Sequence, residues 1–167
     1  MKKLAIVLDT FSDCLGKSVS WICLVMVLVM ALIVVLRYVF QSGSIALQES
    51  VMYLNALIFV FGAAYTLKEQ GHVRVDIFYN RLSPKKQALI DLLGCIIFLL
   101  PSAAFIIWVS WDYVSISWQI KEGSPESSGL PLVYLLKASI IVLPFLLILQ
   151  GISEIIKSIT IIRQSDF

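Results

Sequence analysis

Long apolar runs separated by short polar stretches set the pattern of this chain. Four runs are almost free of charged residues, and they cover positions 19–36, 50–67, 92–111 and 129–153. A helix needs about 20 apolar residues to cross roughly 30 Å of hydrocarbon, so each run is long enough for a membrane span. With their polar flanks included, the runs predict spanning helices over about residues 19–40, 46–67, 88–113 and 130–155.

The predicted fold is therefore all-α, an integral membrane four-helix bundle that forms a single domain over residues 1–167. Composition agrees, because 59% of the residues are hydrophobic, only 14% are charged, and the mean hydropathy is +0.92. These values lie outside the range of ordinary soluble domains. Pro101 and Pro144 fall inside the third and fourth runs and predict kinks there.

Two further segments have the periodicity of helices that lie on a membrane surface. The first is an N-terminal amphipathic surface helix over residues 3–17, whose apolar side consists of Leu4, Leu8, Phe11 and Leu15. The second is an amphipathic cytoplasmic segment between spans two and three, with an apolar stripe formed by Val75, Phe78, Tyr79 and Leu82.

The basic residues predict how the chain is oriented. Ten of the thirteen precede the first span, lie between the second and third spans, or follow the fourth. The other three are Arg37, Lys121 and Lys137. Because cytoplasmic loops carry the excess of Lys and Arg, both termini are predicted to be cytoplasmic. This topology signal is also a sufficient explanation for the cluster of five basic residues within positions 68–86.

Residues that could perform catalysis or bind a metal are scarce. The chain has one histidine, His72, and three cysteines whose placement suggests no disulfide. It contains no phosphate-binding, hydrolase or metal-binding motif. The sequence therefore predicts no enzyme activity, no cofactor, no metal site and no nucleic-acid partner.

Charged residues near the ends of the spans suggest two ion pairs. Arg37 ends the first span and Glu49 begins the second, so they can meet at the outer interface. Asp112 and Lys137 each lie about 9 Å inside a helix end, where an ionisable group is a functional candidate. Ion pairs that clamp neighbouring helices also explain these positions, without any part in transport.

Four fragments of the chain, taken together and in order, resemble one protein family. They are RYVF at 37–40, LQES at 47–50, FGAAY at 61–65 and GHVRVD at 71–76. They look like the small membrane subunit, of the DctQ or SiaQ type, of tripartite ATP-independent periplasmic (TRAP) transporters. Chain length and span number agree with this resemblance over the whole chain.

The resemblance implies a division of labour within a bacterial inner-membrane transporter. A periplasmic solute-binding protein delivers a carboxylate-bearing solute, such as sialic acid or a C4-dicarboxylate, and a large membrane subunit carries it across with sodium ions. The small subunit braces the large one in a heterodimer, a role that suits spans without polar residues at mid-bilayer. Candidate contacts with the large subunit or with phospholipid head groups are Arg37, Glu49, His72, Arg74 and Asp76.

The alternative is a self-contained four-helix transporter that acts as a homodimer. Such a protein would move the solute itself, so it should place a carboxylate nearer mid-bilayer than Asp112 lies. Nothing in the sequence selects one solute over another.

Reporter fusions test the predicted orientation. Fusions after Lys86 and after Phe167 should report a cytoplasmic location, and a fusion within residues 124–128 should report a periplasmic one, because the basic residues are retained inside. A periplasmic signal from the fusion after Lys86 would overturn the topology.

Overall fold

The structure, a computed structural model, describes residues 2–71 and 79–164, and every regular element among them is helical. The elements are α1 (Lys2–Tyr38), α2 (Ile45–Lys68), α4 (Pro84–Gly94), the π-helical turn η1 (Cys95–Leu99), α5 (Leu100–Gln119) and α6 (Val133–Gln164). Since α4, η1 and α5 follow one another without a break, the described residues form four helices long and apolar enough to cross a membrane. The predicted all-α, four-span fold is confirmed.

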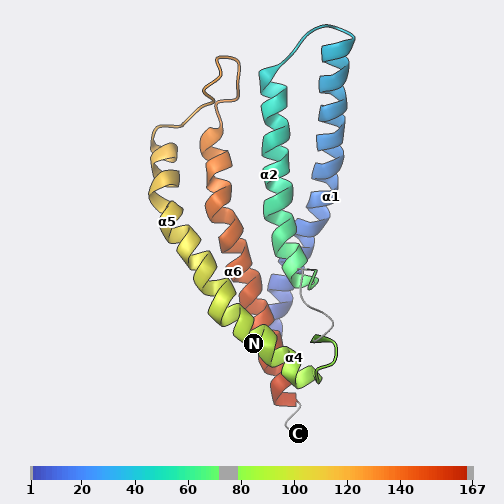
Figure 1. Cartoon of the computed structure of the whole chain (residues 1–167), viewed down its shortest axis with the longest axis vertical. Coiled ribbons are helices and arrows are strands. Elements are labelled where there is room, and N and C mark those ends of the chain that lie inside the picture. The colour runs from blue at the N-terminus through green and yellow to red at the C-terminus, as the bar shows by residue number, and fades with distance from the viewer. Residues whose placement is uncertain (1, 72–78, 165–167) are drawn as a thin grey trace.

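Helix α6 is the centre of the fold, because it packs against every other described helix. Seen side by side, the long helices follow the order α5, α6, α2 and α1 (Figure 1), and the contacts between neighbours agree with this order. Near the lower end of that view, α1 also reaches α6. The small buried core consists of Val60 and Ala64 from α2 and Leu146 from α6.

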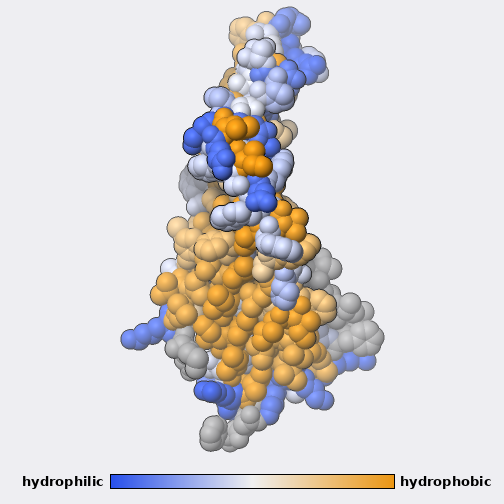
Figure 2. All heavy atoms as spheres, turned by 90° about the vertical axis from the view of Figure 1, so that its left-hand side faces the viewer, coloured by the Kyte–Doolittle hydropathy of each residue, from blue (hydrophilic) through white to orange (hydrophobic). Residues whose placement is uncertain are grey.

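The two ends of the molecule differ in their chemistry. One end holds α4, the start of α1 and the end of α6 (Figure 1), and we call it the basic end for its excess of Lys and Arg. The other, the loop end, holds the connections 39–44 and 120–132. Between them a continuous band of hydrophobic side chains covers the face shown in Figure 2. This is the surface of a multi-pass membrane protein.

Residues 3–17 are helical, as predicted, but they do not form a separate surface helix. Helix α1 runs unbroken into the first span. Gly16 lies so close to α2 that a Cβ atom there would come within 2.4 Å of the Tyr65 ring. Asp13 of α1 forms an ion pair with Lys68 of α2. One side of this part of α1 therefore packs against the protein, where Ala5 and Ser12 are buried, while Leu4, Ile6 and Val7 remain exposed.

The third span accommodates Pro101 through a wider turn. Proline has no N–H and its ring clashes with the carbonyl four residues earlier, which disturbs the α-helical pattern. Just before it, η1 adopts π-helical pairing, and the Leu100 N–H donates to the Cys95 carbonyl. Pro144 lies buried in α6, which continues through it without interruption. At Pro101, where a kink is predicted, the structure has a π-helical turn. At Pro144, where a second kink is predicted, α6 continues without a break.

The predicted amphipathic segment between spans two and three falls mostly on residues 72–78, which lie outside the described residues. Its last part is described. The Tyr79 hydroxyl donates to Asp91 of α4 at 2.6 Å, and the Gln87 side chain donates to the Tyr79 carbonyl at 3.0 Å. These bonds fix the chain where it enters the third span.

Candidate functional site

A cluster of polar side chains joins α1 to α6 near the basic end. We call it the α1–α6 cluster, and its members are Asp9, Ser12, Gln150, Ser153, Glu154 and Lys157. Ser12, Gln150, Ser153 and Glu154 are buried. Buried polar groups are costly unless their hydrogen bonds are made, so the arrangement of these bonds decides whether the cluster stabilises the fold.

Gln150 lies at the centre of the α1–α6 cluster and uses both ends of its amide. It accepts a hydrogen bond from the Ser12 hydroxyl at 2.6 Å, and it donates to Asp9 at 3.1 Å and to Glu154 at 2.9 Å. The Ser153 hydroxyl lies 2.7 Å from Asp9 Oδ1, to which it donates. All these polar groups find partners within the chain, so the cluster holds α1 in register on α6.

One lysine serves both carboxylates of this cluster. Lys157 Nζ lies 3.1 Å from Asp9 Oδ2 and 2.6 Å from Glu154 Oε1. Removing either carboxylate would leave the rest of a partly buried network short of a partner, which costs more than an exposed pair contributes. The arrangement is typical of a structural clamp between two helices.

At the loop end, Glu49 ties the connection 120–132 to the start of α2. Its carboxylate accepts hydrogen bonds from the Ser124 hydroxyl and from the backbone N–H of Leu130, the latter at 2.6 Å. The chain enters this connection through a Schellman turn that closes α5, with Lys121 at φ 50°. In that turn the N–H of Glu122 donates to the Ser117 carbonyl at 3.0 Å. Hydrogen bonds therefore hold the connection near both of its ends, at Glu122 and at Leu130.

Lys137, near the start of α6, pairs with the same connection. Its Nζ lies 2.5 Å from Glu122 Oε2 and 4.2 Å from the centre of the Tyr113 ring. The hydrogen bond from Lys137 holds the pKa of the Glu122 carboxyl below its usual value of 4.5. This contact joins α5, α6 and the connection between them.

The structure separates the ion pairs that the sequence predicts. Asp112 is exposed, and the carboxylate that pairs with Lys137 is that of Glu122. Glu49 bonds to the connection 120–132, and among the described residues no ion pair joins it to Arg37. Arg37 is exposed and lines a polar cleft at the loop end. Both predicted pairings are wrong, because the charges that meet are brought together by a loop whose path the span pattern does not reveal.

His72, Arg74 and Asp76, the other candidate contacts, lie outside the described residues. The α1–α6 cluster was missed by sequence reasoning because its two halves are about 140 positions apart. A weak signal was present, since Gln150, Ser153 and Glu154 recur at helical spacing in an otherwise apolar stretch. The sequence held no corresponding signal for its partner on α1.

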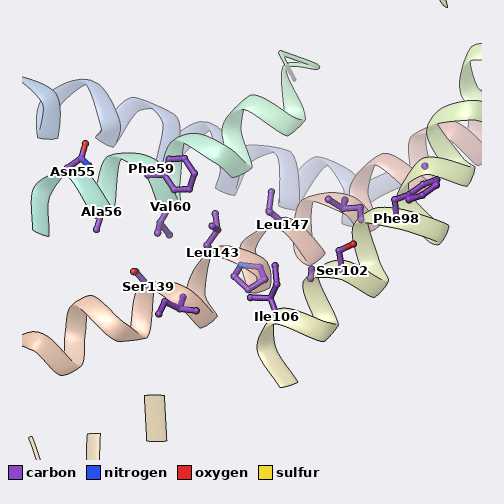
Figure 3. A pocket seen from close by; sticks show the side chains of 15 residues that line it. Asn55, Ala56, Phe59, Val60, Phe98, Ser102, Ile106, Ser139, Leu143 and Leu147 are labelled. Atoms are coloured by element: carbon purple, nitrogen blue, oxygen red, sulfur yellow. The ribbon is translucent and has the colours of Figure 1, made fainter. Parts of the chain in front are cut away.

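A lateral groove opens between α2, α5 and α6, with a volume of about 700 Å³ (Figure 3). Its lining is mostly apolar, but Asn55 of α2 lies on it. Asn55 is near the middle of the 24-residue helix α2 and is exposed. The expectation that no polar residue lies at mid-bilayer is therefore wrong for this position, although the four apolar runs contain no ionisable residue at that depth.

Comparison with known proteins gives a consistent result. The family model for the DctQ component of tripartite ATP-independent periplasmic transporters matches residues 10–161. A protein of Haemophilus influenzae, described as a candidate TRAP transporter small permease protein, is 30% identical over 101 residues. That alignment covers 58% of this chain and 62% of the relative, so the chain spans less than two thirds of the relative's length. No solved structure matches the chain.

The α1–α6 cluster predicts unequal effects for two serines of α1. Ser12→Ala removes the donor to the buried Gln150 and should lower the free energy of unfolding by about 1–3 kcal/mol. Ser18→Ala is the matched control, because the Ser18 hydroxyl bonds only to the Cys14 carbonyl of its own helix, and its cost should stay within about 0.5 kcal/mol. Denaturant unfolding of the detergent-solubilised protein measures both, and equal costs would argue against the clamp.

The Lys137 contact predicts a pH-dependent stability. Because the folded-state pKa of Glu122 is lowered, its pairing stabilises the protein fully above pH 4.5 and loses that effect as pH falls through the lowered value. Thermal unfolding should therefore show Glu122→Gln less stable than the wild type at neutral pH, with the difference shrinking in acid. Asp112→Asn should leave the melting temperature at neutral pH unchanged, because Asp112 is exposed. A loss from Asp112→Asn equal to that from Glu122→Gln would restore Asp112 as the partner of Lys137.

Proposed function

Because the chain belongs to the family of DctQ components of TRAP transporters, we propose that it is the small scaffold subunit of a sodium-coupled transporter of this kind. It braces a large membrane subunit during uptake of a carboxylate-bearing solute, such as sialic acid or a C4-dicarboxylate, which a periplasmic binding protein delivers. Membership of the family makes the chain a transporter component and not an enzyme. A large membrane subunit and a periplasmic binding protein are the family's general partners.

The observation that carries this proposal is the placement of the polar groups. A protein that moves an anion together with sodium ions needs charged or strongly polar groups near mid-bilayer. In the described spans Asn55 lies near mid-depth but carries no charge, and the ionisable groups lie toward the two ends, where the α1–α6 cluster, Glu49 and Lys137 bond within the chain itself. Such a distribution supports a fixed frame, with the solute path in another subunit.

The proposed orientation places the basic end in the cytoplasm of a bacterial cell and the loop end in the periplasm. The excess of Lys and Arg at the basic end supports it. In this orientation the connection 120–132, held by Glu49, faces the binding protein. Its anchoring at both sides favours a rigid surface over a flexible linker.

The segment that contains His72, Arg74 and Asp76 is proposed to contact the large subunit or the phospholipid head groups next to it. The support for this is the resemblance of GHVRVD at 71–76 to the family pattern. An arginine at such a contact offers a planar set of five donors, which a lysine of equal charge cannot reproduce. Charge alone would therefore be insufficient at this position.

Co-expression with the large membrane subunit of the same transporter tests the proposal. Affinity purification through a tag on this chain should recover a one-to-one complex, which native mass spectrometry would identify by its mass. A homodimer of this chain, formed in the presence of the large subunit and without it, would favour the self-contained transporter instead.

Two variants in the same experiment separate a specific contact from a topology signal. Arg74→Lys and Asp76→Asn should each lower the yield of the complex, because a charge-assisted hydrogen bond is lost, while orientation reporters stay unchanged. If both variants give the wild-type yield, the segment acts through its charge alone and the proposed contact is abandoned.

A further inference from the structure

The lateral groove is a feature of the surface that the chain does not fill itself. It is formed by α2 on one side and by η1 and α5 on the other, with α6 between them (Figure 3). The side chains of Phe59 and Phe98 belong to its lining and are both more than half exposed. The lining also includes the small residues Ala56 and Gly94. Small residues at a membrane helix surface allow another helix to approach closely.

Asn55 gives this groove a polar group at an unusual depth. At 1.5 Å per residue it lies about 15 Å from the loop end of α2, which is near the middle of roughly 30 Å of hydrocarbon. Its exposed amide takes part in none of the side-chain hydrogen bonds found among the described residues. By contrast Ser139, on the same groove, donates to the Leu136 carbonyl of its own helix at 2.6 Å.

An amide in hydrocarbon needs hydrogen-bond partners, since no water is available and lipid tails have no polar atoms. A lipid chain in the groove would cover Phe59 and Phe98 but would leave Asn55 unsatisfied. The occupant must instead bring a polar group to mid-bilayer depth. A transmembrane helix with a polar side chain or an open backbone carbonyl meets this requirement, because asparagine side chains form hydrogen bonds between membrane helices.

We propose that a transmembrane helix of the large transport subunit packs in the lateral groove and hydrogen-bonds to Asn55. This inference rests on the proposed function, which supplies the large subunit as partner, and it names the surface and the side chain that receive it. The hydrogen bond at mid-depth fixes the height of the partner helix against α2, and the small residues Ala56 and Gly94 in the lining allow it to approach closely.

Photo-crosslinking in the complete co-expressed complex tests where the large subunit docks. A benzophenone amino acid replaces Phe59, which lines the groove and is 65% exposed, or Leu57, which lies outside it and is 41% exposed. Both positions belong to α2 and lie at nearly the same depth, so only the direction differs. We expect an adduct with the large subunit from position 59 and little or none from position 57.

Two substitutions test the chemistry of the groove. Asn55→Leu removes the hydrogen-bonding group and should weaken recovery of the complex about threefold to tenfold, the range for one interhelical hydrogen bond in a membrane. Asn55→Gln keeps the amide and should retain more of the complex than Asn55→Leu does. Gly94→Leu places a larger side chain in the groove, where a Cβ at Gly94 meets nothing within 4 Å, and should reduce recovery of the complex.

The outcomes separate this inference from the proposed function. Adducts from position 59 with lipid alone, or with a second copy of this chain, would overturn the docking of the large subunit in the groove. So would a complex recovered normally from both Asn55→Leu and Gly94→Leu, and the scaffold proposal would remain in place. If the wild-type chain forms no complex at all with the large subunit, both proposals fall.

Discussion

The absence of water from the hydrocarbon core is the constraint on which this structure depends. Every polar group placed there must find a partner in the protein, so membrane proteins keep such groups few and paired. This chain obeys the rule by moving its ionisable groups toward the ends of its helices. There the α1–α6 cluster and the contacts of Glu49 and Lys137 join segments that are far apart in sequence. The middle of the molecule is held by apolar packing around α6.

This distribution connects the helices at both ends of a bundle whose buried core is small. Hydrogen bonds and ion pairs connect the helices at each end of the molecule. Because Gly16 has no side chain, α1 can also cross closely over α2. A frame fastened at both ends resists sliding of one helix past another, which is what the proposed scaffold role requires. The exception, Asn55, lies on the groove that this chain leaves open.

The spans and the overall fold could be read from the sequence, because the hydrophobic effect and span length are local properties of the chain. The partners of individual charges could not. Lys137 pairs with Glu122 because a Schellman turn directs the chain after α5 back toward α6, and no periodicity encodes that path. Asp9 lies outside the apolar side of the predicted surface helix, yet it bonds to Gln150 and Ser153 of α6. The family resemblance, found in short ordered fragments, is confirmed by the match to the DctQ model.

Solute uptake by reconstituted liposomes tests whether this chain supports transport only together with a large subunit. Radiolabelled sialic acid and a radiolabelled C4-dicarboxylate are offered in turn under an inward sodium gradient, together with the periplasmic binding protein. We expect uptake of one of them only when this chain and the large subunit are present together, and none with this chain alone. Uptake through liposomes that contain this chain as their single membrane protein would contradict this expectation.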